Sequence, residues 1–257
     1  SSFLGIKTGL KTYKVNKSNY KYKVDSKVKS VRPYCTAAVV KGLKFNKDSL
    51  LSLMNLQDKL HTTHGRNRKK VAMGVHDLSK IRFPLTYTTK PKSFKFRALE
   101  DRQEKTIQRI LEEHPKGKDY AHLLNKKEVP IWIDAKDQVL SMPPIINSEE
   151  TKVTIDTKDI FLDLTGTDPI AIDQALNILV TALVDRGGKI YSVNNTPNLN
   201  PKKIKININR LNKLLGTNLA KSQISKLASK MGLSYSQSNS TMLYPAYRAD
   251  ILSEVDI

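Results

Sequence analysis

The chain of 257 residues is long enough for one large domain or two smaller ones with a real hydrophobic core. Its 44 Lys and Arg residues against 24 Asp and Glu residues give a formal net charge of +20. That excess favours nucleic acid, then an anionic membrane, as a partner, although surplus lysines can also form a solvated surface. The single cysteine, Cys35, excludes intrachain disulfides and cysteine-based zinc sites and fits a cytoplasmic protein.

No segment of the sequence predicts a membrane span or a signal peptide. The longest apolar run, Ala175–Val184, contains Asn177 and Thr181 and is too short to cross a bilayer. The chain begins with Ser-Ser and stops at Ile257, so we expect a fragment excised from a longer protein.

The first part of the chain predicts several strands and two helices. Alternating or β-branched segments predict strands at Tyr20–Val24, Tyr34–Leu43, Val71–Val75, Pro84–Tyr87, Ile131–Asp134 and Gln138–Met142. The last two are separated by three residues, which is typical of a hairpin. Apolar residues at helical spacing predict a helix over Asn46–His64 with Ser49 as a candidate cap, and the charged segment Arg97–Glu113 predicts another.

The next part of the chain contains the strongest helix signal. Ile160–Leu164 predicts a strand, and Asp168 followed by Pro169 predicts an N-cap and first helical position. Gly187-Gly188 ends this helix. Strands in hairpins, alternating with a few long helices, predict an α+β fold with a mixed or antiparallel sheet and packed helices.

Turn-forming residues at Asn194–Pro201 predict a linker that separates a small C-terminal unit. This unit has the pattern of a strand, two short helices and a hairpin, which favours a winged-helix-like α+β fold. We therefore expect the tail of an upstream domain at 1–17, a main domain at 18–193 and a small domain, truncated at its C-terminal end, at 194–257.

Several polar residues lie where a core is expected. Gln57 is on the apolar stripe of its helix, where a buried amide needs partners, unless it reaches solvent at the stripe's edge. Asp163 and Thr165 project to the same face of their strand as Phe161, which predicts a polar-lined cavity or a solvent-facing edge.

The histidines are weaker candidates. His61 and His64 have a spacing that can bind metal, but no third ligand is apparent. Either His114 or His122 can be a general base, although a lone histidine is more often structural. The sequence has no GxSxG, Walker or GxGxxG motif, and Ser141 has no base near it in sequence, which argues against a serine nucleophile.

Four separated segments carry an unusual combination of polar residues, histidines and prolines: LQDKLHTTHGRNRKKVAMGVHDL (Leu56–Leu78), HPKGKDYAHLL (His114–Leu124), LSMPPIIN (Leu140–Asn147) and DLTGTD (Asp163–Asp168). In the same order, they resemble the beta subunit of archaeal- and eukaryotic-type phenylalanyl-tRNA synthetase. The resemblance covers nearly the whole chain. It implies a tRNA-editing domain at 18–193, followed by the small domain.

The resemblance also implies roles for individual residues. The family's tyrosine-discriminating pocket falls on Ser141, Asp163 and Thr165, and Trp132 stands at a fourth position that is usually aliphatic. Two further pocket residues, Gln57 and Arg68, match the family, whereas Lys152 replaces an arginine that relatives often carry.

Cations around this pocket and acids at the C-terminal end have implied roles as well. The loop residues Arg66, Lys69 and Lys70 are candidates for tRNA binding through phosphate or ribose. Asp250 and Asp256 match the first two positions of a magnesium motif whose other acids lie beyond Ile257. The resemblance thus implies Mg²⁺ in the full-length subunit, and ATP used by the holoenzyme but not bound by this fragment.

The function implied is editing hydrolysis of the ester in mischarged Tyr-tRNA(Phe). The resemblance implies a parent ligase, a heterotetramer of two alpha and two beta subunits, that attaches phenylalanine to tRNA in the cytoplasm. A synthetic pocket for phenylalanine rejects tyrosine poorly, whereas a second site that hydrogen-bonds the hydroxyl can select it. Two alternatives remain open. The chain can be a non-catalytic winged-helix nucleic-acid-binding protein or a purely structural subunit-assembly module, with alpha-subunit binding and an inert pocket.

Overall fold

The computed structural model describes residues 8–124 and 127–257. The chain divides into two compact units, one formed by Val15–Pro197 and the other by Asn198–Ile257 together with the N-terminal segment. Within the described residues, no helix is long and apolar enough to cross a membrane.

Two five-stranded sheets form the larger unit. The first sheet, in spatial order, contains β1 (Val15–Tyr20), β12 (Lys189–Val193), β3 (Tyr34–Lys41), β11 (Ile160–Gly166) and β4 (Val71–Asp77). The second sheet contains β10 (Ile146–Asn147), β9 (Val139–Met142), β8 (Glu128–Ile133), β5 (Leu85–Pro91) and β2 (Tyr22–Val24). β11 pairs antiparallel with both β3 and β4, which places Asp163 opposite Ala37 and Gly74.

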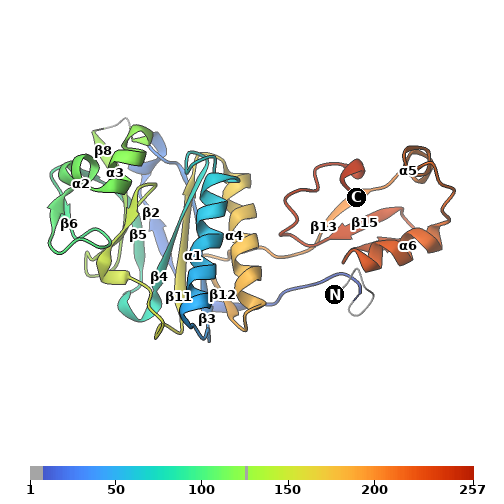
Figure 1. Cartoon of the computed structure of the whole chain (residues 1–257), viewed down its shortest axis with the longest axis horizontal. Helices are drawn as coiled ribbons and strands as arrows, with labels where there is room; N and C mark the ends of the chain where they lie inside the picture. Colours follow the sequence, from blue (N-terminus) through green and yellow to red (C-terminus); the bar gives the residue numbers. More distant parts are fainter. Residues whose placement is uncertain (1–7, 125–126) are drawn as a thin grey trace. The chain divides into compact units, whose positions relative to one another are not determined.

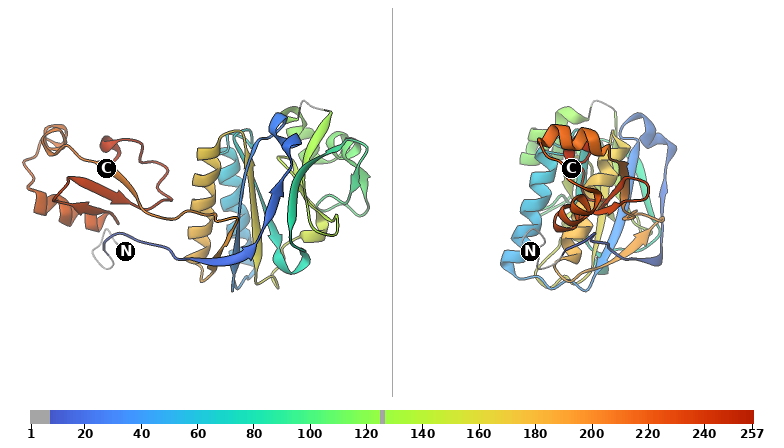
Figure 2. Two further views of the ribbon diagram at one scale, coloured as in Figure 1. Left: turned by 180° about the vertical axis from the view of Figure 1, so that it is seen from behind. Right: turned by 90° about the vertical axis from the view of Figure 1, so that its right-hand side faces the viewer.

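The sheets pack face to face and helices cover their outer faces (Figure 1). Aromatic residues such as Tyr87, Trp132 and Phe161 fill the space between the sheets. The helices α1 (Lys47–Thr62) and α4 (Pro169–Val184) lie on the first sheet. The helices α2 (Ile107–Glu113) and α3 (Pro115–Tyr120) lie on the second. Figure 2 shows the same four layers of this unit from behind.

The predicted helix start of α4 is confirmed. The Asp168 side chain accepts hydrogen bonds from the backbone N–H groups of Ile170 and Ala171, and Pro169 occupies the first helical turn. For α1 the cap is Asn46 rather than the predicted Ser49. Ser49 instead completes a capping box, because its hydroxyl accepts from the backbone N–H of Asn46.

The predicted helix over Arg97–Glu113 is wrong for its first half. Only α2 at its C-terminal end is helical. Before α2, β7 (Lys105–Thr106) pairs with β6 (Lys95–Phe96), which lies just outside the predicted range. Glu100 has a positive φ of 72°, which a helix does not allow. Tertiary packing overrides the charged, helix-favouring composition because Phe96 and Ala98 are buried in the core.

The unit boundaries differ slightly from the expected 18 and 193. β1 begins at Val15 because it pairs with β12, so residues 15–17 belong to the larger unit. The segment before it contributes to the small unit, where the Gly9 N–H donates to the Ser229 carbonyl at 2.8 Å.

The small unit has a three-stranded antiparallel sheet in the order β13-β15-β14. Its elements are β13 (Lys202–Lys205), α5 (Ile208–Leu215), α6 (Lys221–Lys230), β14 (Ser234–Ser236) and β15 (Thr241–Tyr244). Ile224, Leu233 and Met242 lie in its core. The order of strand, two helices and hairpin is the predicted one.

Candidate functional site

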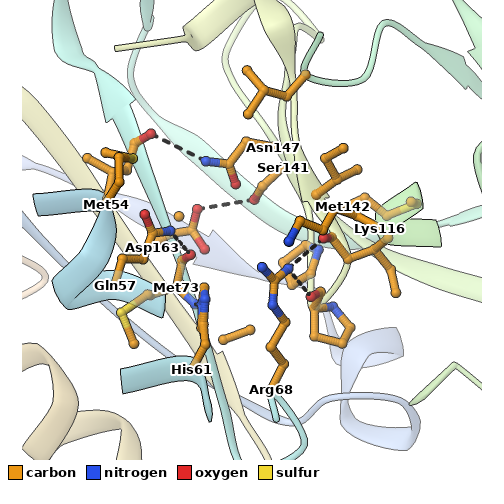
Figure 3. Close-up of a pocket in the computed structure, with 18 of the residues that line it drawn as sticks. Met54, Gln57, His61, Arg68, Met73, Lys116, Ser141, Met142, Asn147 and Asp163 are labelled. Carbon is orange, nitrogen blue, oxygen red and sulfur yellow. Dashed lines mark hydrogen bonds between the residues drawn. The ribbon is translucent and has the colours of Figure 1, made fainter. Parts of the chain in front are cut away.

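A cavity of about 380 Å³ lies beside the neighbouring edge strands β4 and β10 of the two sheets. Its wall on one side is α1, which contributes Met54 and Gln57, and on the other side the segment after β9, which contributes Pro143 and Pro144 (Figure 3). Alternate residues of a strand point to the same face of its sheet. Polar side chains on β11, β9 and β10 therefore reach the cavity from the facing sides of the two sheets.

Asp163 forms the floor of this cavity and is almost fully buried. Its Oδ2 atom accepts a hydrogen bond from the Ser141 hydroxyl at 3.1 Å and lies 2.7 Å from Nε2 of His76. Within the described residues, no hydrogen bond reaches the other carboxylate oxygen, Oδ1. The floor therefore presents a hydrogen-bond acceptor to whatever enters the cavity.

Gly74 makes room for this arrangement. It lies directly opposite Asp163 in the β4–β11 ladder. A Cβ atom at this position would lie 2.3 Å from Oδ2 of Asp163 and 2.5 Å from Nε2 of His76. Glycine is thus required by close approach of the neighbouring side chains.

Gln57 and Arg68 border the cavity through fixed contacts. Gln57 is half-buried on the stripe of α1, and its amide donates to the Met73 carbonyl at 2.8 Å. Arg68 Nη1 donates to the Ile145 carbonyl at 2.7 Å, and its guanidinium lies 4.4 Å from the ring centre of Tyr120. Burial lowers the pKa of Arg68, which nevertheless stays positively charged at neutral pH.

Charged groups surround the mouth of the cavity. Arg68, Lys116 and Lys152 line it, and so does the Asp58 carboxylate. Lys152 is half-exposed, and its Nζ atom lies 3.4 Å from a carboxylate oxygen of Glu149. Three cations near a carboxylate floor, together with the acids Asp58 and Glu100, suit a ligand that carries phosphate at one end and a hydrogen-bond donor at the other.

Comparisons with known proteins identify the family. The model of the B3/4 domain matches residues 18–181, and that of the tRNA synthetase B5 domain matches residues 204–257. The crystal structure of an N-terminal fragment of the phenylalanyl-tRNA synthetase beta subunit from Pyrococcus horikoshii matches with a TM-score of 0.93 and 42% identity. That match covers 99% of this chain and 77% of the other. The chain belongs to the phenylalanine–tRNA ligase beta-subunit family.

Curated relatives of the chain belong to the same family. The phenylalanine–tRNA ligase beta subunits of Archaeoglobus fulgidus and Pyrococcus horikoshii are 44% and 43% identical over 99% of this chain. The matched part is 48% of each relative, so the chain spans about half the length of the curated relatives it matches. The resemblance read from the four motifs and the expected α+β fold are confirmed.

Two residues that the family pattern places in the pocket do not line this cavity. Thr165 is fully buried, and its hydroxyl accepts a hydrogen bond from Nε of Arg32 at 2.8 Å. Trp132 is also fully buried and stacks on Tyr87 with ring centres 5.0 Å apart. Since Trp132 pairs across the ladder with Ser141, its large indole fills space directly behind the floor.

The predicted tRNA-binding cations lie in the turn that follows α1. Three consecutive residues there, Arg66 to Arg68, have positive φ values of 47°, 52° and 66°. Arg66 and Lys69 are exposed, whereas Lys70 forms an ion pair with Asp168 at 2.9 Å. Arg32 fixes this turn from beneath, donating to the Arg68 and Lys69 carbonyls. Arg66 and Lys69 consequently make no side-chain ion pair with another residue in the part of the chain that the structure describes.

The histidines considered for chemistry have structural contacts. Nε2 of His61 accepts from the Met73 N–H at 2.9 Å, and the His64 ring contacts the Ala171 carbonyl at 3.0 Å. His114 caps α3 through Nδ1, while His122 is exposed and lies outside the cavity lining.

The two C-terminal acids do not form a magnesium site here. Asp250 is held by Arg248 in a two-pronged ion pair at 2.7 Å, and Asp256 accepts hydrogen bonds from the backbone N–H groups of Leu252 and Ser253. Residues 8–124 and 127–257 contain no group of three metal-ligating side chains. Mg²⁺ requires near-octahedral oxygen ligation, so these residues alone do not fit it.

The sequence did not point to His76 as a site residue. It lies 87 residues from Asp163, and only the register of β4 and β11 brings the two together. One signal was available, because Gly74 and His76 alternate on the same face of a strand whose flanking residues are apolar.

Proposed function

We propose that this chain performs the editing reaction of a phenylalanine–tRNA ligase beta subunit, the hydrolysis of mischarged Tyr-tRNA(Phe). In this reaction, water adds to the ester carbonyl, and the products are free tyrosine and a tRNA with an unmodified 3′ hydroxyl. The observation that carries the proposal is the Asp163 carboxylate at the cavity floor, with one oxygen lacking a partner among the described residues.

That free oxygen supplies selectivity. The phenolic hydroxyl of tyrosine can donate to Oδ1 of Asp163, whereas phenylalanine leaves this acceptor unpaired in a largely desolvated site. A carboxylate gives a charge-assisted hydrogen bond, which is worth about 1.5–3 kcal/mol. Such a site inverts the preference of an apolar pocket.

The rim supports binding of the tRNA end. We assign Arg68 and Lys152 to contacts with the terminal nucleotide, and Arg66 and Lys69 to phosphates farther along the strand. Gln57, held by the Met73 carbonyl, gives the wall on the α1 side a fixed polar edge. These contacts would hold the ester in place for attack by water.

We assign no covalent nucleophile. The Ser141 hydroxyl donates to the Asp163 carboxylate, and no imidazole contacts it within the described residues. An aminoacyl ester is already labile, so positioning of the ester and water together with polar stabilisation of the oxyanion can be sufficient.

We further propose that the larger unit, Val15–Pro197, carries the editing reaction and that the small unit belongs to the subunit's tRNA- and alpha-facing part. In the parent ligase, two alpha and two beta subunits would attach phenylalanine to tRNA(Phe) in the cytoplasm with ATP. Mg²⁺ would require acids supplied beyond Asp250 and Asp256.

Substitution of the floor residue tests the proposal. We expect Asp163→Ala to lower kcat/KM for Tyr-tRNA(Phe) at least about tenfold, because one charge-assisted hydrogen bond is lost. The slow hydrolysis of Phe-tRNA(Phe) should change little. Asp159→Ala, at the residue just before the same strand and outside the cavity lining, is the matched control. Loss of thermal stability with the preference retained would show that Asp163 is structural.

The two competing functions predict different results. A non-catalytic winged-helix protein would bind duplex nucleic acid through the small unit and leave both esters intact. An assembly module would bind the alpha subunit and also leave both esters intact. The polar floor favours editing, because a purely structural core would fill this position with an apolar side chain.

A further inference from the structure

His76 is a fully buried histidine that lies behind the cavity lining, and both of its ring nitrogens are engaged. Nε2 lies 2.7 Å from Oδ2 of Asp163, and Nδ1 lies 2.8 Å from the Thr151 hydroxyl. Thr151 belongs to the short 3-10 turn Glu149–Thr151 and is itself fully buried. The ring is therefore fixed at both ends, by Asp163 of β11 at Nε2 and by Thr151 of the turn at Nδ1.

The strand register explains how His76 reaches the carboxylate. The residue directly opposite Asp163 on β4 is Gly74, and His76 stands opposite Phe161, one diagonal step away. Diagonal neighbours in a ladder are within reach of a long or aromatic side chain. Because Gly74 has no side chain, the imidazole can lean over the vacant position and meet Asp163.

The hydrogen-bond inventory defines what His76 does there. A carboxylate oxygen only accepts, so Nε2 of His76 carries the proton and donates to Oδ2. The Ser141 hydroxyl donates to the same oxygen from β9. Two donors, one from each sheet, thus contact Oδ2 and hold the carboxylate rotamer, whereas no hydrogen bond from the described residues reaches Oδ1.

We propose that His76 is a positioning residue for substrate selection, because its hydrogen bond to Oδ2 orients the Asp163 side chain so that Oδ1 is available to the phenolic hydroxyl of the substrate. This inference rests on the proposed function and deepens it. Without the His76 donor, one of two contacts that orient the buried carboxylate is lost. The carboxyl group can then turn toward Ser141 and away from the ligand.

A pair of variants separates this role from packing. The amide nitrogen of a glutamine can take the place of Nε2, so His76→Gln retains a donor to Asp163. The amide of an asparagine reaches only the place of Nδ1, so His76→Asn retains a partner for Thr151 and loses the donor to Asp163. Both variants remove the same aromatic ring, which makes their losses of packing similar.

The expected result concerns the preference for tyrosine over phenylalanine, measured as the ratio of kcat/KM on the two charged tRNAs. We expect His76→Gln to keep this ratio within about threefold of the wild-type value. We expect His76→Asn to lower it about tenfold or more, because the discrimination that depends on one hydrogen bond is lost. The decrease should come from Tyr-tRNA alone. Equal losses on both substrates, or an unchanged ratio in His76→Asn, would overturn the inference.

Binding of a non-hydrolysable probe makes the test independent of the reaction. In 3′-deoxy-3′-(tyrosylamino)adenosine and its phenylalanyl counterpart, an amide replaces the ester, so dissociation constants report selection without hydrolysis. If the wild-type chain cleaves neither ester but prefers the tyrosyl probe in a His76-dependent manner, the proposed reaction fails and this inference stands. If the preference does not depend on His76, the inference fails whether or not the ester is cleaved.

The wild-type chain offers a check that needs no folded variant. Nitrogen-15 NMR of the imidazole should show a proton on Nε2 of His76 in a hydrogen bond, with little change when the tyrosyl probe binds. An unprotonated Nε2 would contradict the assignment of His76 as donor to Asp163.

Discussion

Gly74 is the residue at which the smallest chemical change should have the largest effect on the site. A Cβ atom there would come within 2.3 Å of Oδ2 of Asp163, and burial leaves the carboxylate no room to retreat. We expect Gly74→Ala to lower the tyrosine preference at least about tenfold and to destabilise the fold by about 1–3 kcal/mol, as overpacking does.

A matched control for this change is Gly42→Ala. Gly42 has a positive φ of 76°, and nothing lies within 4 Å of a Cβ atom built on it. Alanine there strains the backbone without disturbing Asp163, so stability should fall while the preference is retained. A Gly74→Ala protein with wild-type selectivity would show that the carboxylate need not lie where the structure places it.

His61 should give the fold a measurable pH dependence. Burial lowers the pKa of His61, and its Nε2 accepts from the Met73 N–H, so the folded chain keeps it neutral. The unfolded chain takes up a proton below about pH 6.5, the ordinary value for histidine. The free energy of unfolding should thus decrease as the pH falls from 7.5 to about 5.5.

Urea unfolding of wild type and His61→Gln at both pH values measures this contribution. Glutamine can still accept from the Met73 amide but does not titrate, so the variant should lose less stability between the two conditions. An identical loss in both proteins would show that His61 does not couple folding to pH.

At the scale of elements, the N-terminus of α4 depends on Asp168. Its carboxylate accepts hydrogen bonds from two backbone N–H groups and forms an ion pair with Lys70. The hydrogen bond from Lys70 contributes most to lowering the pKa of Asp168. We expect Asp168→Ala to reduce the free energy of unfolding by about 0.5–2 kcal/mol. Asp168→Asn keeps the cap and removes the ion pair, so it should cost less. Equal costs in urea titrations would mean that the cap contributes nothing.

Local signals made α1 and α4 predictable. Both helices carry a capping residue, an apolar stripe and a terminating turn, all of which act within a few residues. The region around Arg97 lacked such signals, and its charged composition was misleading because Phe96 and Ala98 pack into a distant core. Element type is therefore predictable here where local and tertiary preferences agree.

The candidate site was only partly predictable for the same reason. Gln57 stood out because a polar residue on an apolar stripe needs a partner, and Asp163 because of its spacing from Phe161. The roles of Thr165 and Trp132 depend on which neighbours fill the inter-sheet space, namely Arg32 and the aromatic core. Those neighbours come from strands far away in the sequence.

For the whole molecule, the charge of +20 bears on tRNA binding. Cations that neutralise phosphates release counterions, so affinity for tRNA(Phe) should fall more than about tenfold between 50 and 200 mM salt. Replacing Arg66 and Lys69 together by alanine should reduce the slope of log affinity against log salt concentration by roughly 2.

The control for this change is a charge-matched double variant on the two strands of the first sheet that lie farthest from β4, Lys17→Ala with Lys189→Ala. Lys17 lies on β1 and Lys189 on β12, away from the edge strand β4. Filter-binding titrations over the salt range report all three slopes. The same slope in both double variants would mean that only net charge matters and that the turn after α1 makes no specific contact.

The most direct test of the central claim is the rate at which this chain deacylates Tyr-tRNA(Phe) and Phe-tRNA(Phe), measured side by side with limiting enzyme. A carboxylate floor with a free acceptor predicts faster hydrolysis of the tyrosyl ester, by at least about tenfold, because only tyrosine brings a hydroxyl to Asp163. Hydrolysis of both esters at the rate of the uncatalysed reaction would contradict it.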